Sequence, residues 1–186
     1  SQDSVFMAQQ LTAQGIAVAA INYTLAPKAT LAHIVAQCQR AVAWLLKDAA
    51  SHGVAPQRTV LAGSSAGAHL AAMLLASEWQ TTQGLLPQTV HGCVLLSGLY
   101  DLEPVQRCLP NTWLNLSVQE AQRLSPMQHL PHPTLPLYIA VAERDTDEFK
   151  RQSSDYAATC KAQGNPVTWH ETPQRNHFDI VRDWMD

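Results

Sequence analysis

Three residue types that together activate a hydroxyl nucleophile occur in this chain in the order serine, aspartate, histidine. The serine is Ser65, at the centre of the pentapeptide GSSAG at 63–67, which fits the pattern G-x-S-x-G. Chance alone produces such a pentad in roughly one chain in fifteen of this length, so the pattern by itself is weak. Here it follows the apolar run "TVLA" and precedes "AHLAAMLLASE". That is the strand–turn–helix setting that a nucleophilic serine of this kind requires.

A serine hydroxyl needs a base to accept its proton, and the base needs an acid to orient it. For a serine on a strand–turn–helix elbow, the acid and then the histidine follow in the chain. Asp145, just past the apolar run "LPLYIAVAE", is the candidate acid; Asp147 and Glu148 better suit the first turn of the next helix. His177 lies in a loop near the end of the chain and is the candidate base, whereas His170 falls within the last predicted strand.

The composition fits one folded domain, 1–186, and excludes several classes of partner. Of the 186 residues, 46% are hydrophobic and 15% charged, which is enough to bury a core. A formal net charge of −3 gives no electrostatic basis for binding nucleic acid or an anionic membrane. No apolar run approaches the roughly 20 residues that span a bilayer. The four cysteines form no C-x-x-C pair, so we expect buried thiols in a reducing compartment.

Apolar runs of strand length alternate with segments of helical periodicity along the chain. This alternation predicts an α/β fold, with a mainly parallel sheet and helices on both of its faces. The predicted helices cover about residues 4–14, 31–50, 66–78, 147–163 and 177–185. The five predicted strands are "IAVAAINY" (16–23), "RTVLAG" (58–63), "TVHGCVLLSG" (89–98), "LPLYIAVAE" (135–143) and "PVTWHE" (166–171).

Residues 102–135 interrupt this alternation with prolines and one short predicted helix near 118–124. We interpret them as a cap-like excursion over the strand ends, where sheets of this class keep their sites. Tyr100 and Trp113 are candidate aromatic walls of a pocket there, and packing in the core is the alternative for both.

Six segments resemble the arylformamidase (kynurenine formamidase) branch of the α/β-hydrolase fold, which is close to the hormone-sensitive-lipase-like esterases. The resemblance spans nearly the whole chain and assigns the triad to Ser65, Asp145 and His177. It implies hydrolysis of an aryl formamide of the N-formyl-L-kynurenine type, a small-molecule substrate, in the cytoplasm and without a metal or an organic cofactor. The segments are "YTLAPKATLAHIVAQCQRAVAWL", "LAGSSAGAHLAAMLL", "LSGLYDLEP", "RLSP", "AERDTDEFKRQS" and "NHFDIV".

The chain departs from that family most seriously at the site that stabilises the oxyanion, which needs two or more donors. One donor is expected to be the backbone N–H of Ala66, directly after the nucleophile. The family's second donor comes from an H-G-G-x-W loop before the helix that starts near residue 4, and no such loop is present. The His-Gly pair at 91–92 opens a later strand. Smaller departures are Ser64, where the family usually has histidine, and Ala68, where it commonly has glycine.

The family's strands before that loop are missing too, and one of them lies between the strands expected at 16–23 and 58–63. We therefore expect a gap in the sheet, and a sequence that is the C-terminal portion of a longer hydrolase. Two alternatives to an arylformamidase stay open. One is a short-chain carboxylesterase with the same triad, and the other is an inactive or binding module that lacks the oxyanion loop. A homodimer is also left open.

Overall fold

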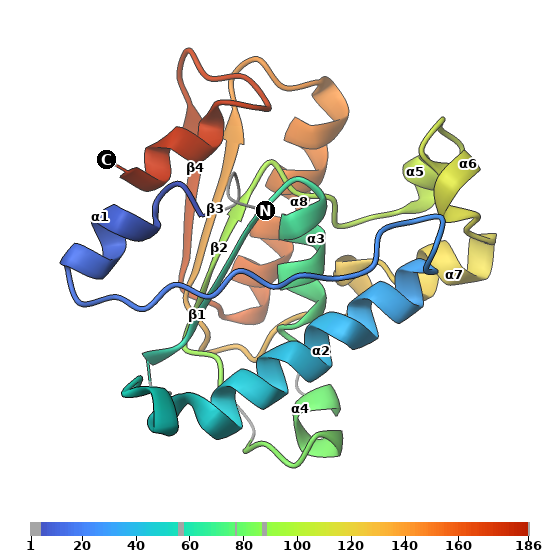
Figure 1. Ribbon diagram of the computed structural model, residues 1–186. Helices are drawn as coiled ribbons and strands as arrows, with labels where there is room; N and C mark the ends of the chain where they lie inside the picture. The colour runs from blue at the N-terminus through green and yellow to red at the C-terminus, as the bar shows by residue number, and fades with distance from the viewer. Residues whose placement is uncertain (1–4, 56–57, 77, 87–88, 186) are drawn as a thin grey trace.

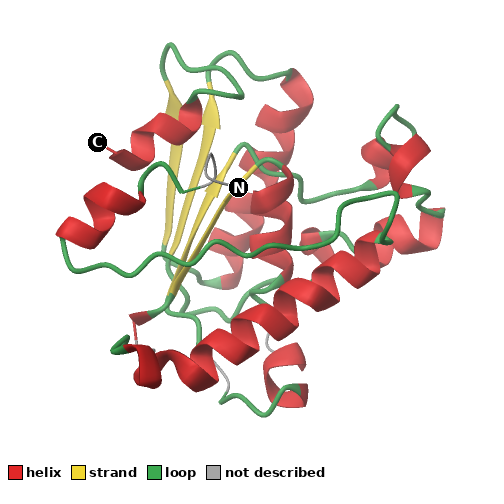
Figure 2. Cartoon of the chain, in the orientation of Figure 1, coloured by secondary structure: helices red, strands yellow, loops and turns green. Residues whose placement is uncertain are grey.

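The computed structural model describes residues 5–55, 58–76, 78–86 and 89–185. A parallel sheet of four strands runs through its centre, and each strand pairs with the next one in the chain. Helices lie on both faces of this sheet (Figure 1), and Figure 2 shows the strands enclosed between them. The predicted parallel α/β fold is therefore confirmed. The strands are β1 (Val60–Ser64), β2 (Gly92–Leu96), β3 (Leu137–Ala142) and β4 (Val167–Thr172).

Local capping signals mark the ends of some of the helices. The longest begins after Thr30, whose hydroxyl accepts a hydrogen bond from the N–H of His33, as an N-cap threonine does. The helices are α1 (Ala8–Ala13), α2 (Leu31–Asp48), α3 (Ala66–Met73), α4 (Glu78–Thr82), α5 (Glu103–Gln106), α6 (Asn111–Leu114), α7 (Val118–Arg123) and α8 (Asp147–Gln163), with 3₁₀ turns η2 (Ala49–His52), η4 (Pro126–Gln128) and η5 (Ile180–Met185).

Alternate residues of the central strands face opposite sides of the sheet. Leu95 and Ile139 pack against α3 and α8 on one face. Leu96 and Ala140 pack against Ile180 of η5 on the other. Because both faces are covered, β2 and β3 read as continuous apolar runs instead of alternating ones.

The strand predicted at 16–23 is wrong. This stretch runs as an extended coil between α1 and α2 (Figure 1), and Ile16 is 49% exposed. Within the described residues the sheet ends at β1 on this side, so no strand is present to pair with 16–23. An extended segment without a neighbouring strand has no ladder partner for its backbone groups.

Three predicted helices differ from the observed ones. The helix expected at 66–78 ends at Met73. The carbonyl of its C-cap residue, Leu74, accepts a hydrogen bond from the indole N–H of Trp79, and α4 is a separate helix. Near the chain end, only 180–185 is helical, as a 3₁₀ turn. The first helix covers Ala8–Ala13, and residue 4 lies outside the described residues. The excursion at 102–135 holds α5, α6, α7 and η4, more helix than expected.

The prediction that Tyr100 forms an aromatic wall of a pocket is wrong. Its side chain is fully buried and stacks on Tyr156, with ring centroids 4.2 Å apart and planes 4° from parallel. Tyr100 is therefore a core residue, whereas Trp113 on α6 is 53% exposed.

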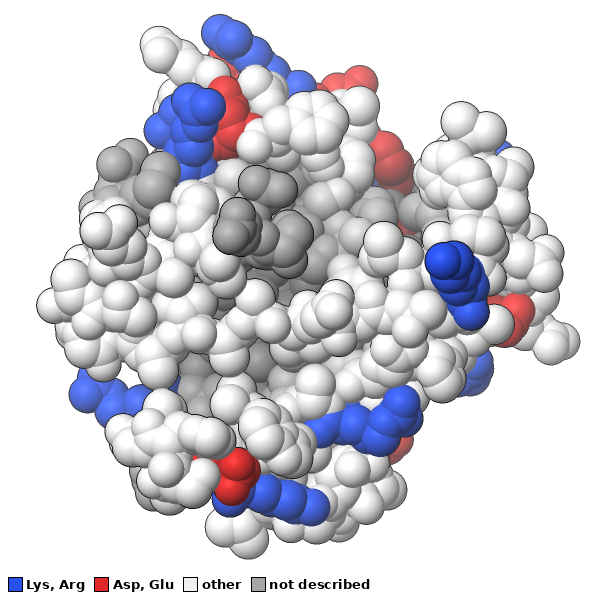
Figure 3. Space-filling view, viewed as in Figure 1, with Lys and Arg blue, Asp and Glu red and all other residues white. Residues whose placement is uncertain are grey.

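The cysteines are all free thiols. Cys38, Cys93 and Cys160 are buried, on α2, β2 and α8 respectively, and Cys108 is exposed after α5. The charged side chains on the face drawn in Figure 3 are scattered and do not gather into one basic patch. In the part of the chain that the structure describes, none of the helices has both the length and the apolar character needed to cross a membrane.

Candidate active site

Ser65 occupies a sharp turn between β1 and α3. Its φ and ψ are 56° and −122°, a backbone conformation that a side-chain-bearing residue adopts only when the surrounding structure imposes it. The Ser65 N–H donates to the carbonyl of Leu96, 2.9 Å away, so the turn is tied to the end of the neighbouring strand. The elbow predicted from GSSAG is present.

The two glycines of the elbow are not equivalent. A Cβ at Gly63 would overlap the backbone carbonyl of Gly67, so position 63 admits no side chain. A Cβ at Gly67 would meet nothing within 4 Å. The close approach at the elbow therefore requires a glycine at Gly63, whereas Gly67 lies in the open first turn of α3.

A chain of hydrogen bonds links the three predicted residues. The Ser65 Oγ lies 2.8 Å from His177 Nε2, and His177 Nδ1 lies 2.7 Å from Asp145 Oδ1. An ionised carboxylate only accepts, so Nδ1–H donates to Asp145 and leaves Nε2 free to accept the serine proton. The side chains come from the carboxyl ends of β1 and β3 and from the loop after β4.

Asp145 is held as a buried carboxylate. Its side chain is 1% exposed, against 21% for His177. The second oxygen, Oδ2, accepts hydrogen bonds from the Ser97 hydroxyl at 2.5 Å and from the Ala142 N–H at 3.1 Å. Burial alone would raise the pKa of this carboxyl, but the hydrogen bonds from His177 and Ser97 outweigh burial and hold the pKa below its ordinary value.

A reciprocal cap fixes the backbone around His177. The Asn176 side-chain oxygen accepts from the N–H of Phe178, while Asp179 accepts from the backbone N–H of Asn176 at 2.6 Å. The Ile180 N–H donates to the Asn176 carbonyl, which starts a helical turn.

Two aromatic rings flank the His177 imidazole. The ring centroids of Phe149 and Phe178 lie 4.4 Å and 5.6 Å from the centroid of the imidazole.

Two features of this site escape sequence reasoning to different degrees. The cap carries a local signal, N-x-x-D at 176–179, which resembles a capping box and points to a helix start. Ser97 carries none, because its contact with Asp145 joins residues 48 positions apart. The contact between Phe149 and His177 likewise has no local signal in the sequence.

The alternative acids and bases do not join the triad. Asp147 and Glu148 start α8, as expected for acidic residues in a first turn. His170 is exposed on β4. His69 is buried behind the elbow, where its Nε2–H donates to the Leu124 carbonyl at 2.8 Å, and burial lowers its pKa to about 4. Among the described residues, no group of three or more His, Cys, Asp or Glu is placed to hold a metal ion.

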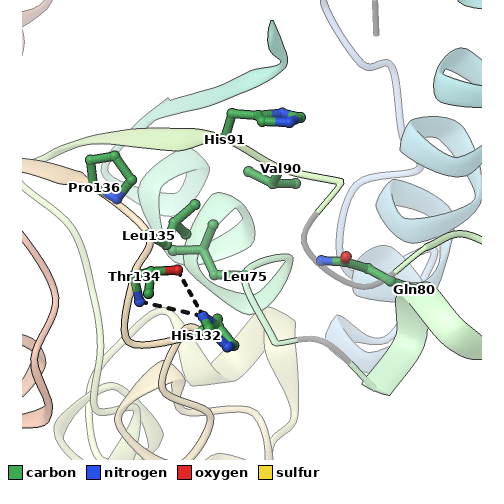
Figure 4. A pocket seen from close by; sticks show the side chains of 8 residues that line it. All are labelled: Leu75, Gln80, Val90, His91, His132, Thr134, Leu135 and Pro136. Atoms are coloured by element: carbon green, nitrogen blue, oxygen red, sulfur yellow. Dashed lines mark hydrogen bonds between the residues drawn. The ribbon is translucent and has the colours of Figure 1, made fainter. Parts of the chain in front are cut away.

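A cavity of about 170 Å³ lies away from the triad. Its walls include Val90 and His91, just before β2, and Leu135 and Pro136, just before β3 (Figure 4). These are the amino ends of the parallel strands, whereas the triad lies at their carboxyl ends. His91 therefore sits at the wrong edge of the sheet to help Ser65, as expected.

The arrangement can activate the Ser65 hydroxyl. A serine within hydrogen-bond reach of an oriented imidazole is the geometry of covalent acyl transfer. The N–H of Ala66 belongs to the first residue of α3, where backbone donors have no acceptor inside the helix. It is thus available to an oxyanion formed at Ser65.

Similar proteins were found by sequence. The chain is 36% identical to a kynurenine formamidase from Salmo salar, over all of this chain and 63% of that protein. It is 33% identical to a kynurenine formamidase from Danio rerio, over 99% of this chain and 62% of that protein. The chain thus spans less than two thirds of the length of these relatives.

Solved structures agree on the fold. A candidate thioesterase from Silicibacter sp. TM1040 superposes with a TM-score of 0.77 at 24% identity, over 97% of this chain and 64% of its own. An esterase from Pyrobaculum calidifontis superposes with a TM-score of 0.74 at 20% identity, over 95% of this chain and 62% of its own. The family model for the alpha/beta hydrolase fold matches residues 2–180. With its parallel sheet and its serine elbow, this chain belongs to the alpha/beta hydrolase fold family.

Proposed function

We propose that this chain carries the catalytic triad of a serine hydrolase that cleaves an aryl formamide to an arylamine and formate. The observation that carries the proposal is the chain of hydrogen bonds from Ser65 through His177 to Asp145, at 2.8 and 2.7 Å. The substrate class is supported by the two relatives named kynurenine formamidase. N-formyl-L-kynurenine is the substrate that this assignment favours.

In the proposed reaction, Ser65 Oγ attacks the formyl carbon and its proton passes to His177 Nε2. The N–H of Ala66 donates to the oxyanion, and a second donor is required beside it. The C–N bond then breaks, and the arylamine leaves with the proton from His177. Water attacks the formyl ester, giving a proton to His177, and formate departs as Ser65 regains its proton. Asp145 stays ionised and stabilises the imidazolium.

The surroundings of His177 suit an aromatic leaving group. The leaving amine must lie near Nε2, from which it takes its proton. Phe178 stands 86% exposed beside that ring, so its face is open to an aryl group. The excursion at 102–135, with exposed Trp113 on α6, is proposed as a further wall of the pocket.

A short-chain carboxylesterase is the second candidate, because the same triad serves ester substrates and the Pyrobaculum calidifontis esterase shares the fold. A cytoplasmic location is proposed from the four free cysteines. A homodimer stays a prediction that sedimentation of the natural polypeptide tests.

The test compares hydrolysis of a formanilide and of p-nitrophenyl acetate by the natural polypeptide, with fluorophosphonate labelling in parallel. Ser65→Ala is expected to lower kcat by about 10⁴–10⁶-fold and to abolish labelling. Ser64→Ala, one residue away in the same motif, is the matched control and keeps both. Preference for the formanilide supports the formamidase, and preference for the acetate supports the esterase. No turnover with no labelling contradicts both and leaves a non-catalytic binding module.

A further inference from the structure

The carboxyl end of β2 lies between the nucleophile and the acid. The Leu96 carbonyl accepts from the Ser65 N–H at 2.9 Å, and the N–H of Ser97 donates to the Ala140 carbonyl of β3 at 2.8 Å. The hydroxyl of Ser97 then reaches Asp145 Oδ2 at 2.5 Å. Two consecutive residues thus connect one strand end to both the serine and the aspartate of the triad.

Ser97 has a backbone conformation that its side chain does not favour. Its φ is +46°, in the left-handed region where glycine is the ordinary occupant. Its side chain is fully buried, and its oxygen lies 3.4 Å from the N–H of Ala142. A strained, buried serine in place of glycine indicates that the hydroxyl itself has a task.

The Asp145 carboxylate needs more than one hydrogen bond to fix its orientation. The torsion that turns a carboxyl group has broad minima, so one hydrogen bond to His177 leaves its plane poorly fixed. Because an ionised Asp145 only accepts, the Ser97 O–H must donate, and such charge-assisted bonds are short and strong. With Oδ2 held by Ser97 and by the Ala142 N–H, Oδ1 is left facing His177.

We propose that Ser97 is a positioning residue of the triad, whose hydroxyl fixes the rotation of the Asp145 carboxylate and so the orientation of the His177 imidazole. This inference rests on the proposed function, since it assigns Ser97 a part in the same catalytic chain. Ser97 touches Asp145 and not the reacting atoms, so its loss lowers kcat and leaves KM nearly unchanged.

Two substitutions separate the hydroxyl from the backbone. Ser97→Ala removes the hydroxyl, and Ser97→Gly removes it and relieves the left-handed strain, so it also serves if the alanine variant does not fold. Both are expected to lower kcat about 10–100-fold, the range seen when a group that orients a metal ligand is lost. Ser153→Ala, a fully buried serine of α8, is the matched control and keeps kcat. Full activity in Ser97→Gly would overturn the proposal, because only strain would then matter.

A readout independent of activity separates this inference from the proposed function. The ¹³C resonance of the Asp145 carboxyl, assigned with Asp145→Asn, reports the pKa of that group. His177, the titratable side chain in contact with Asp145, is present in every variant. Loss of the Ser97 hydrogen bond removes a donor to the charged form, so the pKa of Asp145 rises in both Ser97 variants. An unchanged pKa overturns the inference. A wild type that hydrolyses neither substrate contradicts the proposed function alone.

Discussion

The tetrapeptide Ile-Ala-Val-Ala occurs twice in this chain, at 16–19 and at 139–142. The second copy forms the end of β3, and its four residues are at most 1% exposed. Ile139 and Ala140 pair with both β2 and β4, and Val141 and Ala142 pair with β4. The first copy is an extended coil, with Ile16 49% exposed. The same side chains therefore become a buried strand only where neighbouring strands supply hydrogen-bond partners and helices cover both faces.

Amide hydrogen exchange gives the largest expected difference between the two copies. The amides of 140–142 are expected to exchange only through global unfolding, and those of 17–19 through local motion. The difference amounts to about 10³-fold or more for a domain of ordinary stability. Native-state exchange followed by mass spectrometry or NMR measures both copies in one sample. Similar protection of 17–19 would show that this segment is paired in solution.

The elbow glycines repeat the contrast between residue type and surroundings. Gly63→Ala places a Cβ against the backbone of Gly67, and a loss of more than about 4 kcal/mol or a failure to fold is expected. Gly67→Ala fills open space in α3 and is expected to raise stability, by at most about 1 kcal/mol. Urea unfolding of both variants measures these two changes in stability. Equal losses would mean that the elbow is crowded on both sides.

Truncating the isoleucine of each copy tests the same difference in burial. Ile139→Ala leaves a cavity in a fully buried position and is expected to cost about 2–5 kcal/mol of unfolding free energy. Ile16→Ala removes a half-exposed side chain and is expected to stay within about 0.5 kcal/mol of wild type. The difference between the two urea midpoints is the measurement. A cost at Ile16 near that at Ile139 would contradict the coil assignment.

Features whose signal is local or ordered along the chain could be predicted from the sequence. The elbow at Ser65 has a motif, and Asp145 and His177 follow it in the order and at the strand ends that the fold requires. Features that depend on contacts between residues far apart in the sequence could not be predicted. The run at 16–23 looks like a strand until its pairing is known, and Tyr100 looks like a pocket wall until Tyr156 is found stacked on it. Ser97 is in the same class, since only the folded chain brings it to Asp145.

The positions of the four cysteines allow local unfolding of this chain to be followed by thiol labelling. Alkylating reagents attack the thiolate, and burial raises the pKa of Cys38 and of Cys160 to about 11 and that of Cys93 higher still. A native molecule thus offers one ready target, Cys108. Every further equivalent consumed reports the release of α2, of the sheet or of α8, so the order in which the thiols react would map the order in which the fold comes apart.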